Sequence, residues 1–524
     1  MGWVDKKLDL NEALTFDDVV ILPTYTEVLP HEPDVSSYLT KKIKLHTPFV
    51  SSPMESVTEY KLAIAIAQNG GFGFIHRNLT PTEQVQQVKQ VKRYEAFLIE
   101  NPTVVKARKK RKGSFYPTKV KEVLSLREKY GYSTFPVVDE NNNLVGIVTD
   151  KDVRWRSLDE LVEDIMVKDV VTIPYVKNDD KLREMAIEAM RDYRVGCVVV
   201  TRRRNSKKIK GLITETDIKK RDKFPYATRD KKGRLMVGAA IGVGEKELER
   251  VAKLYEAEVD AIVIDISHGH CKNLLDVLYQ IKSKEYLTKV KETVKRVKKD
   301  YDIPVVGGNI VTKEAVEDLY SAEADALRVG IGPGSICTTR VVVGIGLPQI
   351  SAILETAEVA RDYGIPIIAD GGIKYYGDIA KAIAAGASTV MMGRLFAGTQ
   401  EAPGELVSLH GRLYKKYFGM ASERALKNKA GGGRLRYLEF LDKSIDYLQV
   451  FPQGVEGYVD YAGSLSDVIN QMREALKKAM AATNSRTIKE FHENAVLRKV
   501  SKSGAIEGHP SVTLEKEPIN YRKT

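Results

Sequence analysis

"PIIADGGIKYYGDIAKAIAAGASTVMMGR", residues 366–394, is the stretch that decides the fold. An apolar run ends in Asp370 and two glycines, a helical pattern follows in "DIAKAIAAGA", and a second apolar run, "TVMMGR", begins directly after it. Strands that are apolar throughout and alternate with amphipathic helices form a parallel sheet with helices on its faces. The stretch therefore predicts a strand, a helix and the next parallel strand of an α/β fold.

Apolar runs of the same kind recur along the chain, and most are followed by a helical pattern. Besides 366–372 and 389–394, they are "PFVSSPM" (48–54), "GFGFIH" (71–76), "VGAAIG" (237–242), "AIVIDIS" (261–267), "PVVGGNI" (304–310) and "ALRVGIG" (326–332). Eight such units predict a closed (β/α)8 barrel of the TIM-barrel type rather than an open sheet.

Polar residues or glycines stand at the carboxyl ends of seven of these runs. They are Ser52, His76, Asp265, Asn309, Gly332, Asp370 and Gly393. The carboxyl ends of barrel strands meet on one face, where active sites are built. Glycines that close tight turns explain some of these positions, but a shared site explains them together.

Residues 98–228 interrupt this pattern with an internal repeat. "FPVVDENNNLVGIVTDKDV" (135–153) is echoed by "GCVVVTRRRNSKKIKGLITETDI" (196–218), so that Gly146, Thr149 and Asp152 recur 65 residues later. The repeat resembles a tandem CBS (Bateman) domain, which binds adenine or guanine nucleotides in many families. We therefore predict a first barrel part in 1–97, a CBS pair in 98–228, and a second barrel part with a flap and C-terminal tail in 229–524.

Composition narrows the class of protein. The 524 residues are 43% hydrophobic and 29% charged, and no apolar run approaches the roughly 20 residues that span a bilayer. Three scattered cysteines and a start without a signal-peptide pattern lead us to expect a reducing cytoplasm. The net charge of +12 would attract polyanions, but we interpret the basic stretches 106–112 and 201–208 as solvated loops and nucleic-acid binding as a minor alternative.

One of the three cysteines lies in "VGIGPGSICTTR" (329–340), just past the sixth predicted strand. Glycines before Cys337 allow the backbone to approach a ligand closely. A partly exposed cysteine near backbone dipoles is a candidate nucleophile. A small buried hydrophobic residue is the alternative, and spacing alone leaves both open.

The cysteine loop also carries a family resemblance. "GIGPGSICTTR", together with "SSPM", "DGGI", "MMGR", "YFGM" and "QGVEG", resembles the IMP dehydrogenase and GMP reductase family. The likeness runs from "LTFDDV" (14–19) to "EKEPINY" (515–521). In the dehydrogenases of this family, a cysteine thiolate adds to C2 of inosine 5′-monophosphate (IMP) and a hydride passes to NAD. Water then hydrolyses the covalent thioimidate to xanthosine 5′-monophosphate, a step of guanine nucleotide biosynthesis.

The resemblance implies roles for particular residues. Cys337 corresponds to the nucleophile, Thr339 to a residue that delivers water, and the flap pair Arg436 and Tyr437 to the group that activates water. Residues that correspond to the IMP site are Ser52, Met54, Ser335, Asp370, Gly371, Gly372, Met392, Gly393, Arg394, Tyr417, Phe418, Gly419, Met420 and Gln453. Residues that correspond to the NAD site are Asp265, Ser267, Asn309, Gly330, Ile331 and Gly332.

The resemblance further implies an ion and an assembly. A potassium ion is expected on carbonyl groups of Gly332, Gly334 and Cys337, completed by Glu507, Gly508 and His509 from a neighbouring subunit. This arrangement implies a homotetramer, and CBS domains could join tetramers into octamers. Purine nucleotides are expected at the CBS pair, with Thr149, Asp152, Thr214 and Asp217 as the candidate contacts, although a purely structural role for the pair stays open.

GMP reductase, which deaminates GMP to IMP with NADPH, is the main alternative. "GMASERALKNKAGG" resembles a reductase flap segment, and "MREALKKAM" replaces a glycine-rich motif of the dehydrogenases. The Arg-Tyr pair, "EGH" in the tail, "HRN" at 76–78 and the CBS pair favour the dehydrogenase. A nucleotide sensor or nucleic-acid-binding protein without catalysis is disfavoured because Cys337, Thr339, Arg436 and Tyr437 are all present.

Overall fold

A computed structural model describes residues 11–94, 98–100, 102–111, 114–130, 133–283, 303–423, 425 and 452–512. The chain divides into two compact units. The first comprises Met1–Tyr94, Tyr226–Asp230 and Leu235–Thr524, and the second comprises Glu95–Pro225 and Lys231–Arg234.

The first unit is built on a closed parallel barrel, which confirms the predicted (β/α)8 fold. The hydrogen-bonded order is β15-β16-β17-β18-β19-β20-β4-β5. Its strands are β4 (Phe49–Ser51), β5 (Phe72–Ile75), β15 (Gly238–Ile241), β16 (Ala261–Ile264), β17 (Val305–Ile310), β18 (Ala326–Val329), β19 (Ile367–Asp370) and β20 (Thr389–Met392). Each lies within one of the eight apolar runs, because a strand of a parallel barrel is covered on both faces and is therefore mainly apolar.

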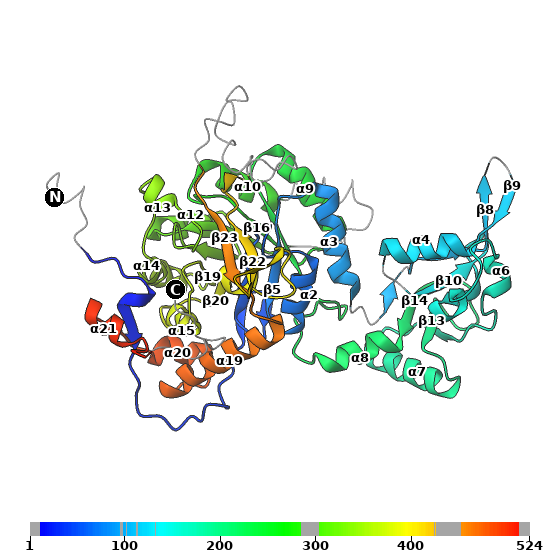
Figure 1. Ribbon diagram of the computed structural model, residues 1–524, viewed down its shortest axis with the longest axis horizontal. Helices are drawn as coiled ribbons and strands as arrows, with labels where there is room; N and C mark the ends of the chain where they lie inside the picture. Colours follow the sequence, from blue (N-terminus) through cyan, green and yellow to red (C-terminus); the bar gives the residue numbers. More distant parts are fainter. Residues whose placement is uncertain are drawn as a thin grey trace. The chain divides into compact units, whose positions relative to one another are not determined.

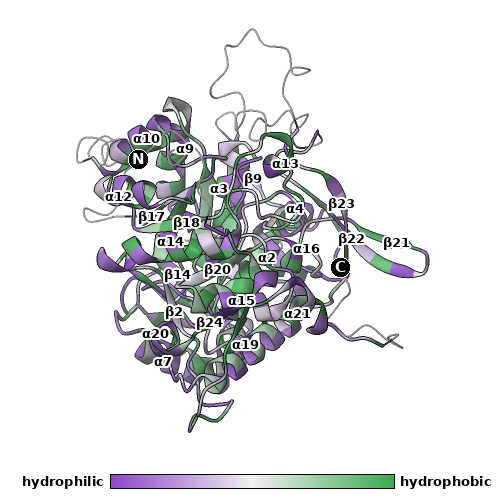
Figure 2. Cartoon of the chain, turned by 90° about the vertical axis from the view of Figure 1, so that its left-hand side faces the viewer, coloured by the Kyte–Doolittle hydropathy of each residue, from purple (hydrophilic) through white to green (hydrophobic). Residues whose placement is uncertain are grey.

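Helices cover the outside of the barrel (Figure 1). They are α2 (Tyr60–Gln68), α3 (Pro81–Tyr94), α9 (Glu245–Glu256), α10 (Lys272–Lys282), α12 (Lys313–Ser321), α14 (Gln349–Asp362) and α15 (Tyr376–Ala384), with short helices α13 (Thr339–Val342) and α16 (Arg394–Ala397) after two strands. Figure 2 shows mainly hydrophobic strands inside and polar stretches on the surrounding helices. The helical pattern "DIAKAIAAGA", residues 378–387, predicted α15.

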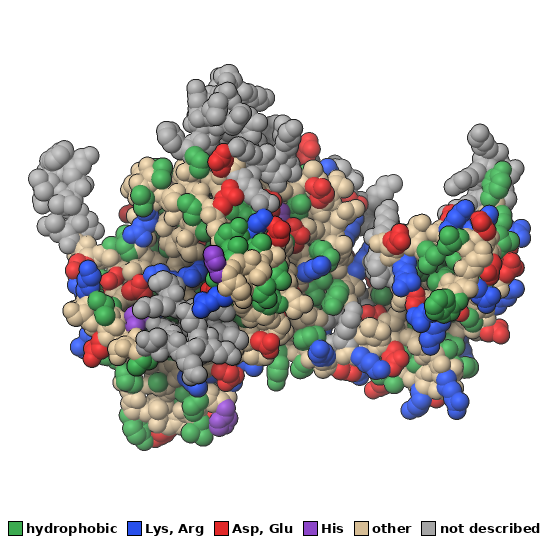
Figure 3. Space-filling view, viewed as in Figure 1, with side chains coloured by type: hydrophobic (Ala, Val, Ile, Leu, Met, Phe, Trp, Pro, Cys, Tyr) green, Lys and Arg blue, Asp and Glu red, His purple; other side chains and the backbone are tan. Residues whose placement is uncertain are grey.

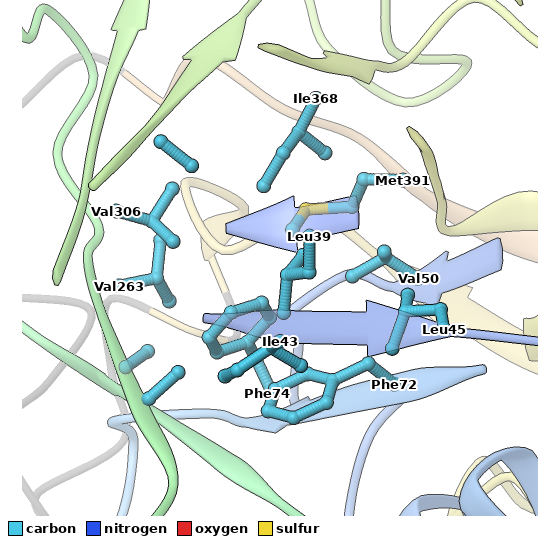
Figure 4. Packing of buried hydrophobic residues seen from close by; sticks show 13 residues of the cluster. Leu39, Ile43, Leu45, Val50, Phe72, Phe74, Val263, Val306, Ile368 and Met391 are labelled. Atoms are coloured by element: carbon cyan, nitrogen blue, oxygen red, sulfur yellow. The ribbon is translucent and has the colours of Figure 1, made fainter. Parts of the chain in front are cut away.

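A hairpin before the first barrel strand completes the core. Its strands β2 (Ser37–Thr40) and β3 (Ile43–Leu45) pair antiparallel. Leu39, Ile43 and Leu45 are buried among residues of the barrel interior, including Phe74 and Met391 (Figure 4). Since β3 leads directly into β4, the hairpin lies at the amino ends of the strands and leaves the carboxyl ends open for a site.

The segments outside the barrel strands contain more regular structure than the sequence indicated. Strands β21 (Leu406–Leu409), β22 (Arg412–Phe418) and β23 (Glu456–Asp460) form an antiparallel sheet that extends from the barrel (Figure 2). It is followed by α19 (Leu465–Ala482), α20 (Ile488–Asn494), β24 (Leu497–Lys499) and α21 (Lys502–Glu507). After the 3-10 helix η1 (Phe16–Asp18), β1 (Val19–Ile21) pairs antiparallel with β24, which brings the two ends of the described chain together.

The second unit contains two copies of one strand-strand-helix arrangement. The first is β10 (Thr134–Val138), β11 (Leu144–Thr149) and α5 (Asp150–Val153), and the second is β13 (Cys197–Thr201), β14 (Ile209–Thr214) and α8 (Glu215–Lys223). Helix α4 (Val120–Tyr130) precedes the first copy, and α7 (Asp179–Asp192) precedes the second. Helix α6 (Val162–Ile165) lies in the chain between the first copy and α7. Strands β6 (Ile99–Glu100), β7 (Val105–Lys106) and β12 (Thr172–Pro174) complete the two sheets.

The two basic stretches differ in structure. Residues 202–205 are exposed in the turn between β13 and β14, as predicted for a solvated loop. The stretch 106–112 instead contains strand β8 (Arg108–Arg111), paired antiparallel with β9 (Ser114–Pro117), so the prediction of a loop was wrong there. Phe115 and Tyr116 supply β-forming residues that favour this hairpin.

Positive and negative side chains are interspersed over the surface in view (Figure 3). Among the residues that the structure describes, no helix combines the length and the hydrophobicity that crossing a bilayer requires.

Candidate active site

A cleft opens at the carboxyl ends of the barrel strands. Its walls come from the residues that follow β4, β16, β18, β19 and β20, and from the segments beside β22 and β23. These segments are far apart in the chain, and the barrel brings them together because parallel strands all end on the same face.

Most residues predicted for the site line this cleft. They are Ser52, Met54, Asp265, Ser267, Asn309, Gly330, Ile331, Gly332, Gly334, Ser335, Cys337, Thr339, Asp370, Gly371, Gly372, Met392, Gly393, Arg394, Tyr417, Gly419, Met420 and Gln453. Six of the seven strand-end residues are among them, and the exception is His76. Its ring is buried and its Nδ1 accepts a hydrogen bond from the Asn78 backbone N–H at 3.2 Å.

Cys337 is half-buried, and its thiol is the start of a short hydrogen-bonded series. The Sγ atom donates to Thr339 Oγ1 at 3.2 Å, and Thr339 Oγ1 donates to Gln453 Oε1 at 3.1 Å. The series joins the loop after β18 to the segment before β23. A thiol held in this way faces the cleft in a fixed position and has a hydroxyl group beside it.

Backbone hydrogen bonds hold the cysteine loop against its neighbours. Thr338 N donates to Gln453 O at 3.0 Å, and Val455 N donates to Ile336 O at 3.0 Å. Gly332 has φ +87°, and a Cβ at this position would approach Arg340 Cγ to 2.3 Å. The positive φ and this close approach together favour glycine at position 332.

Arg328, which the sequence analysis did not identify, lies at the centre of the cleft's ionic network. It is buried in β18, where its NH1 donates to Asp265 Oδ1 at 2.7 Å and its Nε donates to Asp370 Oδ2 at 2.8 Å. Burial by itself would lower the pKa of Arg328, but the two carboxylates outweigh it and raise the pKa above its ordinary value. A charged residue inside the apolar run "ALRVGIG" was the sequence signal for this role.

Asn309 connects this network to the start of the cysteine loop. Its Nδ2 donates to Asp370 Oδ2 at 2.9 Å and to Gly330 O at 2.8 Å. The amide therefore fixes the carboxylate of Asp370 and the first residue of the cysteine loop together.

Tyr417, in β22, also lines the cleft. Its hydroxyl is near Met54 Sδ, at 4.0 Å, and a Cβ on Gly393 would approach that hydroxyl to 2.6 Å. Burial raises the pKa of Tyr417 above its ordinary value, so the phenol stays protonated well above neutral pH. The absence of a side chain at Gly393 leaves the backbone accessible beside the phenol.

Several predicted residues are not in the cleft of this chain. Phe418 alternates with Tyr417 along β22, and its backbone N–H and carbonyl both contact Ser56 Oγ, at 3.3 and 3.2 Å. Glu507, Gly508 and His509 do not line the cleft, and the His509 ring lies 5.7 Å from that of Tyr375. Arg436 and Tyr437 lie outside the described residues.

In the second unit, the predicted threonine and aspartate residues bond to each other. Thr149 Oγ1 donates to Asp152 Oδ2 at 2.7 Å, and Thr214 Oγ1 donates to Asp217 Oδ2 at 2.5 Å. Each pair stands where a helix begins, α5 in the first copy and α8 in the second. The recurring motif thus has a local structural use as a helix start.

Comparison with known proteins agrees with the geometry. Residues 13–511 match the model of the IMP dehydrogenase / GMP reductase domain family. The chain is 45% identical over 524 residues to an inosine-5′-monophosphate dehydrogenase of Aquifex aeolicus, covering 99% of each. It is 43% identical over 522 residues to the enzyme of the same name from Methanocaldococcus jannaschii, again covering 99% of each.

A solved structure of the other activity is also similar. A cysteine-to-alanine variant of GMP reductase from Trypanosoma brucei, in complex with guanosine 5′-monophosphate, has a TM-score of 0.85 and 31% identity, covering 97% of this chain and 100% of that one. A reductase thus matches nearly the whole length of this chain, so the presence of the insertion, which the sequence analysis took to favour the dehydrogenase, does not by itself distinguish the two activities. The identities to the dehydrogenases are higher, at similar coverage of this chain. The chain belongs to the IMP dehydrogenase / GMP reductase family.

Proposed function

We propose that this protein oxidises IMP to xanthosine 5′-monophosphate, with NAD as the hydride acceptor and Cys337 as the nucleophile. The observation that carries the proposal is the half-buried thiol of Cys337 in the strand-end cleft, bonded to Thr339 and through it to Gln453. The higher identity to dehydrogenases than to the reductase, 45% against 31%, supports this direction of chemistry.

The thiol makes hydride transfer from C2 of the hypoxanthine base possible. C2 of the purine is a poor hydride donor until a nucleophile makes it tetrahedral, and a thiolate both adds readily and departs readily. Sulfur therefore bonds to C2, a hydride leaves C2, and a thioimidate between Cys337 and the purine results. Water then adds to that carbon, the C–S bond breaks, and the thiol is restored with release of the product.

The walls of the cleft fit a nucleoside monophosphate. Ser335, Arg394 and the backbone of Gly372 and Gly393 offer donors for the phosphate at one end. Asp370, held by Arg328, has the acceptor oxygens that ribose hydroxyls require. The base then extends toward Cys337, with Met420 and Gln453 beside it and Ser52 and Met54 below.

The opposite part of the cleft fits the nicotinamide nucleoside. Asp265 and Ser267 supply oxygens for a second ribose, and Asn309 has a buried Oδ1 with no hydrogen-bond partner among the described residues. Gly330, Ile331 and Gly332 form the adjoining wall. NAD, when bound, supplies the acceptor for the hydride that leaves C2, and these residues orient it.

Water activation is assigned to Thr339 with Arg436 and Tyr437. Thr339 Oγ1 is 3.2 Å from the Cys337 sulfur, which suits a hydroxyl that positions water beside the C–S bond. Arg436 and Tyr437 carry this role by resemblance to the family. Because arginine is almost always protonated, we assign proton removal to the Arg436, Tyr437 and Thr339 hydroxyl system as a unit.

We further propose a potassium ion at the cysteine loop and a homotetramer. Carbonyl groups of Gly332, Gly334 and Cys337 are the ligand type that potassium prefers. Gly334 O accepts the Cys337 N–H at 3.0 Å, which uses one of its two lone pairs. Glu507, Gly508 and His509 lie outside the cleft of their own chain, in keeping with a role in a neighbouring copy.

The second unit is proposed to be a tandem CBS domain that binds purine nucleotides and can join tetramers into octamers. Its two matching strand-strand-helix copies support this assignment. Nucleotide contact by Thr149, Asp152, Thr214 and Asp217 requires that ribose hydroxyls share or replace the hydrogen bonds within each pair. A reducing cytoplasm is the proposed location, since catalysis depends on a free thiol.

One spectrophotometric experiment tests the activity. The full chain with IMP, NAD and potassium chloride is expected to increase absorbance at the wavelength of reduced cofactor, and the chain with GMP and NADPH is expected to show no change. A fall in NADPH absorbance in the GMP mixture, without an increase in reduced-cofactor absorbance in the IMP mixture, would assign the protein to the reductase branch. No change in either mixture would refute both activities.

A further inference from the structure

Gln349 is a fully buried polar residue that does not line the cleft. It is the first residue of α14, directly after the N-cap Pro348. A buried amide requires partners, so its contacts indicate what it is for. They connect two barrel strands that both end at the proposed site.

The amide nitrogen of Gln349 bridges the last residues of two neighbouring strands. Nε2 donates to Val329 O at 2.9 Å and to Asp370 O at 3.2 Å. Val329 ends β18 and Asp370 ends β19, whereas the strand register stops at Val329↔Ala369. Since both partners are carbonyl oxygens, only the NH2 end of the side chain can face them. The side chain therefore connects the two strands one residue beyond the last pair of their register.

The same amide packs against the root of the cysteine loop. Gly330 is the first loop residue, with φ +135°, and a Cβ there would lie 2.8 Å from Gln349 Oε1 and 2.3 Å from Asp370 O. Glycine at this position leaves the space that the amide and the carbonyl occupy. The path of the chain toward Cys337 thus begins against Gln349.

Asp370 is the second group whose position depends on this contact. Its carboxylate accepts from Arg328 and Asn309 and faces the cleft, while its own carbonyl accepts from Gln349. One side chain therefore contacts both the backbone of the residue whose carboxylate is proposed for the ribose and the root of the loop that carries the thiol. Displacement of reacting groups by about 1 Å can lower a rate about 100-fold, so this distance matters for the reaction.

We propose that Gln349 is a positioning residue that sets the distance between Asp370 and the Cys337 loop. The inference rests on the proposed function, since it concerns the alignment of the bound nucleotide with the thiol. Gln349 touches neither substrate nor cofactor in this scheme. Its removal should misalign the purine and the sulfur while the separate binding contacts remain.

The chain offers a matched control in Gln84. This residue of α3 is also fully buried, and its Nε2 donates to Ala240 O at 2.9 Å and to His76 O at 3.1 Å, between the ends of β15 and β5. It is an amide bridge of the same kind at a strand pair away from the cysteine loop, and it does not line the cleft. Gln84→Met removes the same bridging NH2 group and also the Oε1 that accepts from Arg250 NH1 at 3.0 Å, so it should disturb the fold at least as much as Gln349→Met.

Gln349→Met and Gln84→Met are compared with the wild-type full chain in steady-state kinetics. Gln349→Met is expected to lower kcat about 10- to 100-fold with the KM for IMP changed by about twofold or less. Gln84→Met is expected to keep kcat within about threefold of the wild-type value. Equal losses in the two variants, or an unchanged kcat in Gln349→Met, would overturn the proposal. So would failure of Gln349→Met and Gln349→Asn to fold when Gln84→Met folds, because Gln349 would then be a stability residue only.

Failure of the proposed function has a different signature. If wild-type protein turns over GMP with NADPH instead, the function is wrong and the kcat comparison is made in that reaction. If it turns over neither pair, the variants are compared by the rate at which iodoacetamide alkylates Cys337. Peptide mass spectrometry measures that rate. A Cys337 rate changed at least about threefold in Gln349→Met but not in Gln84→Met supports the positioning role, and equal rates refute it.

Discussion

Two cysteines in two regions of the molecule show how the same residue type acquires opposite properties. Cys337 follows a barrel strand and lines a cleft, where its thiol donates to Thr339. Cys197 begins β13 in the second unit, where burial, and secondarily the carboxylate of Asp152, raises its pKa to about 11. Burial disfavours the thiolate of Cys197, whereas Cys337 lines an open cleft at the strand ends.

Polar pairs show the same contrast between the regions. In the second unit, Thr149 and Asp152 bond to each other at the start of a helix. In the barrel, the carboxylate of Asp370 is held by Arg328 from within the wall and faces the cleft. A polar group therefore becomes a site residue when other groups orient it without covering it. The following experiments test how far this difference holds.

Replacing the two cysteines should give the largest difference. Cys337→Ala is expected to lower turnover by about 1000-fold or more, because Cys337 supplies the only thiol among the described residues that line the cleft. Cys197→Ala should leave turnover within about twofold of the wild-type value. NADH formation under saturating IMP and NAD measures both, and isothermal calorimetry should show that Cys337→Ala still binds IMP. Turnover by Cys337→Ala above about a tenth of the wild-type rate would contradict a covalent role.

Removing a buried ion pair should cost more stability than removing an exposed one. Arg328→Met leaves Asp265 and Asp370 buried without their shared cation, which should lower the free energy of unfolding by about 3 kcal/mol or more. Arg183→Met, which removes the more exposed pair with Asp222, should cost about 1 kcal/mol or less. Urea denaturation of each full-length variant measures the two effects. Equal costs would show that burial does not distinguish the pairs.

The raised pKa of Cys197 predicts how its alkylation depends on pH. With a pKa of about 11, its thiolate is scarce at pH 8, and iodoacetamide should react about 100-fold more slowly than with an ordinary cysteine thiol. The rate should rise about tenfold per pH unit until it approaches the pKa. Asp152→Asn should lower the pKa and speed the reaction, because it removes a nearby negative charge. Peptide mass spectrometry follows the modification, and a rate that is flat between pH 8 and 10 would contradict the shift.

The smallest effect is expected at the helix start in the second unit. Thr149→Ala removes the hydroxyl that bonds to Asp152 and should lower the free energy of unfolding by about 1 kcal/mol. Turnover in the barrel should not change. Thermal denaturation and the NADH assay on one preparation provide both measurements. A loss of turnover at a temperature where Thr149→Ala is still folded would show that this threonine does more than stabilise its helix.

The barrel strands and the cleft could be predicted because they depend on local patterns. "PIIADGG" places a strand and its polar end within seven residues, and parallel strands bring all such ends to one face. The same argument failed for His76, whose strand end is covered by buried polar neighbours. It also missed Gln349, since nothing in "GLPQIS" indicates that its amide reaches two other strands.

By itself, the sequence determined the alternation of apolar strands and helices, the repeat in the insertion and the glycine loop around Cys337, because each depends on residues close together in the chain. Only the tertiary structure decided that Arg328 joins Asp265 and Asp370, that Leu39 and Ile43 fill the end of the barrel, and that Thr339 meets Gln453. Those contacts join segments tens to hundreds of residues apart, and which side chains meet depends on strand order and packing rather than on any local pattern.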